Sequence, residues 1–207
     1  MRALVTGASR GIGAALVAEG RARGHAVSGT TRQGPDALDV TDAAAQARVA
    51  EATGPLDLLV CNAGVFADRA AGIDAVTADQ LAQSFAVNVT GVALTVQAQR
   101  RNLSRGGRIA VISSQMGSSE RLGSQGLAYR ASKAAAVNLA LNLAEALRPE
   151  GIAVGVYHPG WVRTDMGGGG AAISAEDSAR GLWDRFESLD LSTSGCFETW
   201  NGAVHPV

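Results

Sequence analysis

Apolar runs and amphipathic segments alternate along the whole chain. Short runs, most of them continuously apolar, predict strands at residues 2–6, 25–31, 56–61, 107–112, 152–157 and 195–199. Helical periodicity predicts helices at residues 11–23, 41–53, 77–103 with a break near Phe85, 126–148 and 175–187. Residues 37–39 are a candidate for a further edge strand. This rhythm is typical of an α/β fold, a Rossmann-like, doubly wound and mostly parallel sheet with helices on both faces.

Length and composition narrow the class of protein. The chain has 207 residues, 46% apolar and 18% charged, so we expect a single domain over residues 1–207. A net charge of -1 without runs of like charge argues against nucleic acid as a partner. Cys61 and Cys196 are too far apart in sequence for a zinc motif, so no metal site is expected. No apolar stretch approaches the ~18 residues of a membrane span, and no targeting segment precedes the first strand. We therefore expect a cytoplasmic protein that acts on small molecules.

A glycine-rich loop, residues 6–13, joins the first predicted strand to the first predicted helix. In this context Gly7 permits a sharp turn, Gly11 lets the backbone approach a pyrophosphate, and Gly13 allows close contact between helix and strand. The N-terminus of the helix then offers free N–H groups to phosphates. An ordinary glycine turn is the alternative in a chain with 26 glycines. The loop's position favours a dinucleotide site formed by Gly7, Ser9, Arg10, Gly11, Ile12 and Gly13.

The end of the second predicted strand indicates which dinucleotide is bound. It reads Thr30-Thr31-Arg32 and lacks the carboxylate that would bind a ribose 2′-hydroxyl. Arg10 and Arg32 can together bind a 2′-phosphate through forked donors, so we expect NADP(H) in preference to NAD(H). The alternative for Arg32 is a solvated surface residue. Further along the chain, Asp39 and Val40 are candidates to contact the adenine.

The candidate chemistry centres on the single lysine among 18 basic residues. Lys133 follows Tyr129 by four residues, so both project from one face of the predicted helix. We expect the ammonium to lower the pKa of the phenol toward a range useful for proton transfer. Ser114 follows the strand at 107–112, where ligands of open parallel sheets bind. Asn88 is a further polar candidate within an apolar helical segment.

Six motifs in order resemble the short-chain dehydrogenase/reductase (SDR) family across the whole chain, and look most similar to the C-factor-like small carbonyl reductases. They are the glycine loop, Asn62-Ala63-Gly64, Asn88, Ser114, Tyr129-x-x-x-Lys133 and His158-Pro159-Gly160-Trp161-Val162-Arg163-Thr164. The resemblance implies that Tyr129 is the general acid or base, Ser114 holds the substrate oxygen, Lys133 binds the nicotinamide ribose and Asn88 holds a water. It also implies cofactor contacts from Asn62, Ala63, Gly64, Tyr129, Lys133, Pro159, Gly160, Val162 and Thr164.

The resemblance further implies an oxidoreductase that transfers a hydride between NADP(H) and a small carbonyl or alcohol. It implies a homodimer or homotetramer formed through the helices at 77–103 and 126–148. The separation between Ser114 and Tyr129 exceeds the commonest spacing in the family, so either the loop between them bulges over the substrate pocket or Ser113 replaces Ser114 as the working serine. A dinucleotide-sensing regulatory or signalling protein is the alternative function, but such a protein would not need the serine, tyrosine and lysine together.

Overall fold

The computed structural model describes residues 1–34 and 36–207 of the chain. Its centre is a six-stranded sheet in the order β2-β1-β3-β4-β5-β6, with every neighbouring pair parallel. This confirms the predicted Rossmann-like architecture. The strands are β1 (Arg2–Val5), β2 (Ala26–Gly29), β3 (Leu56–Cys61), β4 (Leu103–Ile112), β5 (Ala153–His158) and β6 (Phe197–Thr199).

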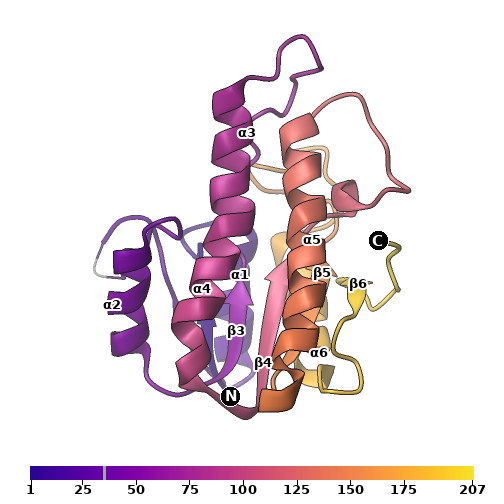
Figure 1. Ribbon diagram of the computed structural model, residues 1–207. Coiled ribbons are helices and arrows are strands. Elements are labelled where there is room, and N and C mark those ends of the chain that lie inside the picture. The colour runs from indigo at the N-terminus through magenta and orange to yellow at the C-terminus, as the bar shows by residue number, and fades with distance from the viewer. Residues whose placement is uncertain (35) are drawn as a thin grey trace.

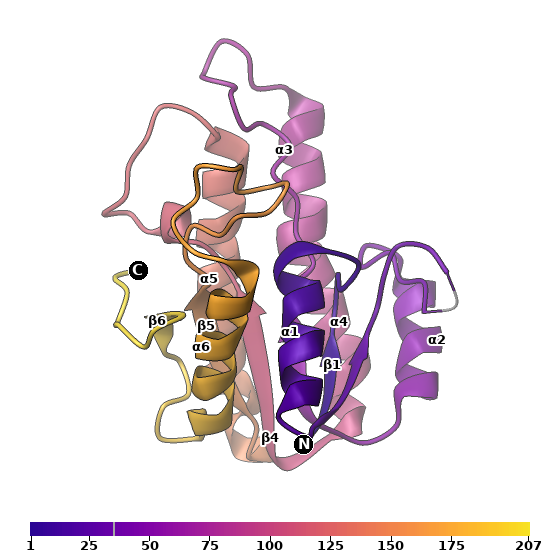
Figure 2. The same cartoon turned by 180° about the vertical axis from the view of Figure 1, so that it is seen from behind.

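Helices cover both faces of the sheet, as expected. In Figure 1, α2, α4 and α5 lie over the near face, and Figure 2 shows α1 and α6 over the other face. Because all the strands are parallel, their carboxyl ends meet at one edge of the sheet, where ligands of such folds bind. The helices are α1 (Gly11–Ala22), α2 (Ala43–Thr53), α3 (Ala78–Phe85), α4 (Gly91–Gln99), α5 (Leu127–Leu147) and α6 (Ala175–Ser188).

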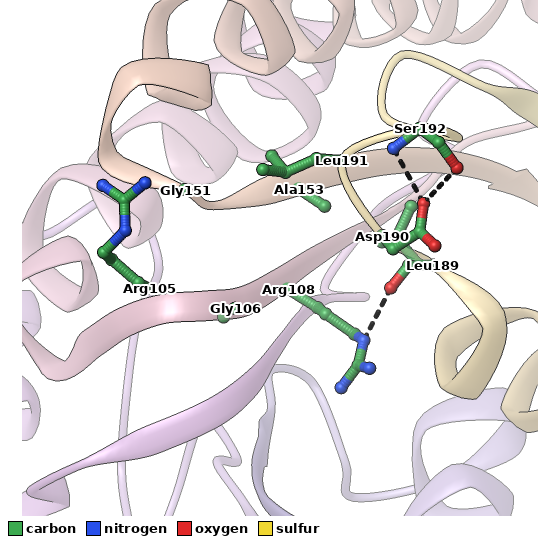
Figure 3. Close-up of a pocket in the computed structure, with 10 residues that line it drawn as sticks. Arg105, Gly106, Arg108, Gly151, Ala153, Leu189, Asp190, Leu191 and Ser192 are labelled. Carbon is green, nitrogen blue, oxygen red and sulfur yellow. Dashed lines mark hydrogen bonds between the residues drawn. The ribbon is translucent and has the colours of Figure 1, made fainter.

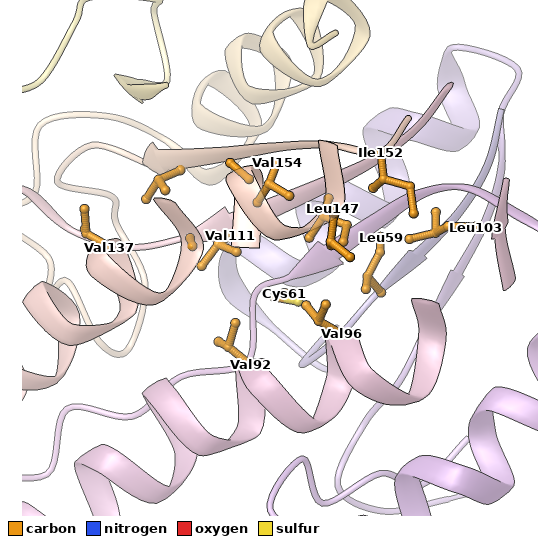
Figure 4. Packing of buried hydrophobic residues seen from close by; sticks show 14 of the residues in the cluster. Leu59, Cys61, Val92, Val96, Leu103, Val111, Val137, Leu147, Ile152 and Val154 are labelled. Atoms are coloured by element: carbon orange, nitrogen blue, oxygen red, sulfur yellow. The ribbon is translucent and has the colours of Figure 1, made fainter. Parts of the chain in front are cut away.

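A hydrophobic core fills the space on each side of the sheet. On the side of α4 and α5, buried aliphatic side chains of the helices interdigitate with those of β3, β4 and β5 (Figure 4). On the other side, Trp183 of α6 is fully buried and donates a hydrogen bond of 2.8 Å to the carbonyl of Leu16 in α1. These contacts hold the helix termini in place above the carboxyl edge of the sheet.

The expected break near Phe85 is present as a π-helix, Ala86–Thr90, between α3 and α4. The predicted helix at 77–103 ends early, since Leu103 already belongs to β4, four residues before the predicted start of that strand at 107. The reason is an irregular pairing of β3 with β4, in which Leu56 pairs with Leu103 and Leu58 with Arg108. Gly106, at φ +85°, lies inside this irregular stretch.

The predicted edge strand at residues 37–39 is wrong. The described chain forms one isolated bridge there, between Thr31 and Ala37, and the Leu38 N–H donates to the Thr31 carbonyl at 2.7 Å. Leu38 is buried in a small cluster with Val40 and Ala45 of α2, so it packs beneath that helix. The apolar character of this piece reflects that packing and not a strand.

Within the described residues, no helix combines the length and the hydropathy that a bilayer crossing demands. The same residues contain no group of three His, Cys, Asp or Glu side chains arranged to hold a metal ion.

Candidate active site

The glycine loop turns from β1 into α1 with the geometry of a phosphate-binding loop. Gly7 and Gly11 adopt φ values of +69° and +56°, which residues with a side chain rarely adopt. Arg10 is the N-cap of α1 but makes no side-chain capping bond, and the first turn contains no acidic residue. The N–H groups of the first turn of α1 are therefore not capped by a side chain, which suits an anionic group.

The segment after β3 braces this loop. The Asn62 side chain donates to the carbonyls of Thr6 and Gly7 at 2.9 and 3.1 Å, and the Asn62 and Ala63 N–H groups both donate to the Thr6 hydroxyl at 3.1 Å. Both amide hydrogens of Asn62 are therefore used within the protein. The side chain shapes the loop, and the cofactor contact that the resemblance implies for Asn62 stays a prediction.

Of the residues expected around the adenosine, Arg10, Arg32 and Asp39 are exposed and Val40 is buried. Arg32 is exposed, and Arg10 forms an exposed ion pair of 3.1 Å with Asp165. A hydrogen bond from the Thr41 N–H is the main cause that lowers the pKa of Asp39, and the charge of Arg32 contributes to the shift. Val40 is buried, and a Cβ on Gly91 would lie 2.7 Å from its side chain.

Tyr129 and Lys133 lie one turn apart in α5, and both are buried, with 7% and 5% of their surface exposed. The Lys133 ammonium lies 5.7 Å from the centre of the Tyr129 ring and donates to the carbonyl of Ile112, the last residue of β4, at 2.9 Å. The Ser113 hydroxyl donates to the Lys133 carbonyl at 3.0 Å. The Ser114 hydroxyl accepts the Met116 N–H at 3.1 Å, and a hydrogen bond with the Ser114 side chain acts to lower the pKa of the Tyr129 phenol. Ser114, and not Ser113, faces the tyrosine.

The pKa of the Tyr129 phenol is raised, whereas the sequence led us to expect a lowered pKa. Burial raises the pKa of Tyr129 to about 12, against the opposing effects of the Ser114 hydroxyl and the Arg69 charge. Burial also lowers the pKa of Lys133 to about 8. The expectation that the ammonium lowers the pKa of Tyr129 is therefore wrong for the protein alone. Desolvation outweighs the attraction, and the ammonium is directed to a backbone carbonyl.

Asn88 lies in the π-helix and connects α5 to the segment after β3. Its side chain accepts the Val65 N–H at 2.9 Å and donates to the Val65 carbonyl at 3.0 Å and to the Ser132 hydroxyl at 2.9 Å. The Ser132 hydroxyl in turn donates to the Tyr129 carbonyl at 2.8 Å. Both amide hydrogens of Asn88 are used in this way, and the water that the resemblance implies at Asn88 stays a prediction.

The segment after β5 returns to the glycine loop. The chain turns at Gly160, where φ is +89°, and the Ser178 hydroxyl holds the Pro159 carbonyl at 2.6 Å. Val162 is buried and pairs with Ile173. A Cβ on Gly11 would lie 3.2 Å from the methyl group of Thr164, so this segment approaches the start of α1.

Three residues near the tyrosine had no role in the sequence prediction. The Phe66 ring stacks on the Tyr129 ring with centroids 4.1 Å apart, and the Arg69 guanidinium lies 5.5 Å from the centre of the Phe66 ring. Asp68 is buried and binds the first turn of α5. One feature of the sequence indicated that a residue from elsewhere caps this helix: its N-cap position is Gly126, which has no side chain.

A cavity of about 440 Å³ lies at the opposite edge of the sheet, at the starts of β4 and β5 (Figure 3). Its two arginines are held by backbone carbonyls, Arg105 by Pro149 and Arg108 by Leu189. The cavity lies at the starts of these strands, whereas Tyr129 lies beyond their carboxyl ends, so the cavity is separate from the site around Tyr129. Its lining comprises Arg105, Gly106, Gly107, Arg108, Gly151, Ala153, Leu189, Asp190, Leu191 and Ser192.

The fold and the glycine loop together define a dinucleotide-binding protein. A model of the short chain dehydrogenase family matches residues 1–171. The C-signal protein of Myxococcus xanthus is 39% identical over 158 residues, which cover 74% of this chain and 94% of that protein. The chain belongs to the short-chain dehydrogenase family and is an oxidoreductase.

Solved structures agree with this assignment. The NADPH-bound carbonyl reductase from chicken fatty liver has a TM-score of 0.88 at 30% identity, over 100% of this chain and 98% of that one. A short-chain dehydrogenase/reductase from Burkholderia multivorans with bound NADP has a TM-score of 0.89 at 28% identity, over 100% and 99% of the two chains. The resemblance extends to the same single-sheet architecture.

Proposed function

We propose that this protein is an NADP(H)-dependent reductase of small carbonyl compounds, built as one dinucleotide-binding domain over residues 1–207. The observation that carries the proposal is the convergence of Ser114, Tyr129 and Lys133 at the carboxyl end of β4. The three side chains offer a hydroxyl, a phenol and an ammonium within one buried cluster. This set of groups suits the protonation of a carbonyl oxygen.

The cofactor assignment rests on the loop after β1. The first turn of α1, which no side chain caps, and the two glycines with positive φ suit a pyrophosphate, and the two solved neighbours described above contain NADPH or NADP. When bound, the cofactor supplies the hydride. The residues proposed to hold it are Gly7, Ser9, Arg10, Gly11, Ile12, Gly13, Arg32, Asp39, Val40, Asn62, Ala63, Gly64, Tyr129, Lys133, Pro159, Gly160, Val162 and Thr164.

Each side chain of the site has its own role in the proposed reaction. With a pKa of about 12, the Tyr129 phenol is protonated at neutral pH and is ready to donate its proton to the substrate oxygen. Ser114 holds that oxygen by a hydrogen bond. With a pKa of about 8, Lys133 is mostly charged at neutral pH and is proposed to bind the ribose hydroxyls beside the nicotinamide. Asn88 holds α5, and with it the tyrosine, against the segment after β3.

The direct test measures NADPH consumption with a panel of aldehydes and ketones. Tyr129→Phe removes the acid, and we expect a loss of about 10²- to 10⁴-fold in kcat. Tyr157→Phe is the matched control, because Tyr157 is the second of two tyrosines and packs against Phe186 in the core on the other face of the sheet. Equal activity of the wild type and Tyr129→Phe on every active compound would refute the proposed acid.

The choice of cofactor has its own test. Arg32→Ala should weaken NADPH binding much more than NADH binding, because NADPH alone carries the 2′-phosphate. Arg48→Ala, which removes an exposed arginine of α2, is the control. An equal loss of affinity for both dinucleotides would contradict the assignment of Arg32 to the 2′-phosphate.

The similarity to the C-signal protein favours a second candidate, a dinucleotide-sensing regulatory protein with little turnover. Tight NADPH binding without consumption on any compound of the panel would favour this second function. We also propose a homodimer or homotetramer that associates through the outer faces of α4 and α5. Light scattering of the purified protein measures its mass, and a monomer at micromolar concentration would contradict this assembly.

A further inference from the structure

The start of α5 is capped by a residue from a distant part of the chain. Ala128 and Tyr129 occupy the second and third positions of this helix, where backbone N–H groups have no partner within the helix. The Asp68 carboxylate accepts both, from Ala128 at 2.6 Å and from Tyr129 at 3.1 Å. Asp68 is 1% exposed. It therefore makes the two bonds of an N-cap side chain from 60 residues earlier in the chain.

The stacking of Phe66 on Tyr129 explains why the helix does not cap itself. The N-cap position is Gly126, which has φ +67° and no side chain. A Cβ there would lie 2.9 Å from the Phe66 ring, which stacks on the ring of Tyr129. A serine or aspartate at 126 would therefore displace Phe66. Asp68, two residues after Phe66, supplies the missing cap.

The Asp68 carboxylate also places a charge near the tyrosine. Among residues 1–34 and 36–207, no basic side chain forms an ion pair with it. Its negative charge lies at the positive end of the α5 dipole. The two cations that face Tyr129 are Lys133 on its own helix and Arg69 beyond Phe66.

We propose that Asp68 is a positioning residue for Tyr129, which holds the backbone of the tyrosine in place and adds a negative charge at the start of its helix. The inference rests on the proposed function, in which Tyr129 is the acid. The carboxylate binds the N–H of the tyrosine itself, so its loss displaces the phenol from the substrate oxygen. The loss of its negative charge also favours the phenolate.

Asp68→Asn separates this role from ordinary helix capping. Asparagine can accept one of the two N–H groups and carries no charge. We expect kcat to fall by about 10- to 100-fold, while the NADPH dissociation constant stays within about twofold, because small displacements of a catalytic group are costly. Asp42→Asn is the control for loss of a negative charge at a helix N-terminus. Asp42 accepts the N–H groups at the second and third positions of α2, both through Oδ1, at 2.8 and 3.1 Å, and α4 lies between this helix and α5 in Figure 1.

A spectroscopic titration gives a readout that does not depend on activity. The chain has two tyrosines, so ¹³C labelling of the tyrosine ring yields two signals, from Tyr129 and Tyr157. In Asp68→Asn the Tyr129 signal should titrate at lower pH than in the wild type, and the Tyr157 signal should not move. Asp68→Glu keeps the charge and displaces the acceptor, so it should lower kcat without this change in titration.

The double variant with Tyr129→Phe tests whether Asp68 acts through the tyrosine. If it does, Asp68→Asn causes no further loss of the residual rate in that background. The proposal would be overturned if Asp68→Asn had the same kcat as Asp42→Asn and if the Tyr129 signal titrated as it does in the wild type. Full activity of Tyr129→Phe alone would refute the proposed function instead, and the titration would still report whether Asp68 acts on the phenol.

Discussion

The buried ammonium of Lys133 should lower the free energy of unfolding at neutral pH, and this effect can be measured. Lys133 is 5% exposed, and within residues 1–34 and 36–207 its ammonium has one hydrogen-bond acceptor, the Ile112 carbonyl. Burial lowers its pKa from 10.5 to about 8, so folding works against the charged form. Lys133→Met keeps a flexible side chain of similar length and removes the charge. The variant should lose reductase activity and yet become more stable at neutral pH.

The magnitude follows from the two pKa values. Below pH 8 the lysine is charged in both the folded and the unfolded chain, and the difference between 10.5 and about 8 costs the fold about 3 kcal/mol, at 1.36 kcal/mol per pH unit. The lost bond to the Ile112 carbonyl costs the variant about 1 to 2 kcal/mol. The variant should therefore be more stable than the wild type by about 1 to 2 kcal/mol at pH 7.

The sign of the effect reverses with pH. Above 10.5 the lysine is neutral in both states, so the penalty disappears and the wild type should be more stable by about 1 to 2 kcal/mol. Urea unfolding of the ligand-free proteins at pH 7 and pH 11, followed by tryptophan fluorescence, measures both differences. Lys133 is the single lysine, so comparison with the variant isolates its titration. A variant that is less stable at pH 7, or a difference that does not change with pH, would refute the reasoning.

The remaining predictions concern crowding and thiol chemistry. Gly13→Ala should weaken NADPH binding at least about tenfold, because a Cβ there would lie 2.6 Å from Asn62 Nδ2 and distort the glycine loop. Gly20 lies in the same helix, but a Cβ there would be crowded against Trp183. Gly20→Ala should therefore lose about 1 to 3 kcal/mol of stability and keep its affinity for NADPH. Equal NADPH affinities of Gly13→Ala and Gly20→Ala would contradict this contrast. Cys61, whose pKa burial raises to about 12, should react with a thiol reagent at pH 8 only after unfolding; rapid labelling of the native protein at this residue would show the burial to be wrong.

Much of the fold was predictable from local pattern. The run at 56–61 corresponds residue for residue to β3, and α1 and α5 agree with their predicted ranges to within one residue at each end. Buried strands and amphipathic helices each have a period that the chain displays directly. The misses arose where local signals were ambiguous. Leu103 was predicted to end a helix but begins β4, and the buried Leu38 reads as a strand but packs beneath α2.

The sequence by itself determined the presence of the glycine loop and placed Tyr129 and Lys133 on one face of a helix, since spacing along a helix fixes which residues are neighbours. Only the tertiary structure decided that Ser114 faces the phenol, that Asp68 and Phe66 hold the tyrosine, and that burial sets its pKa. Those properties depend on contacts between segments as much as 60 residues apart and on the exclusion of water, which no local pattern records.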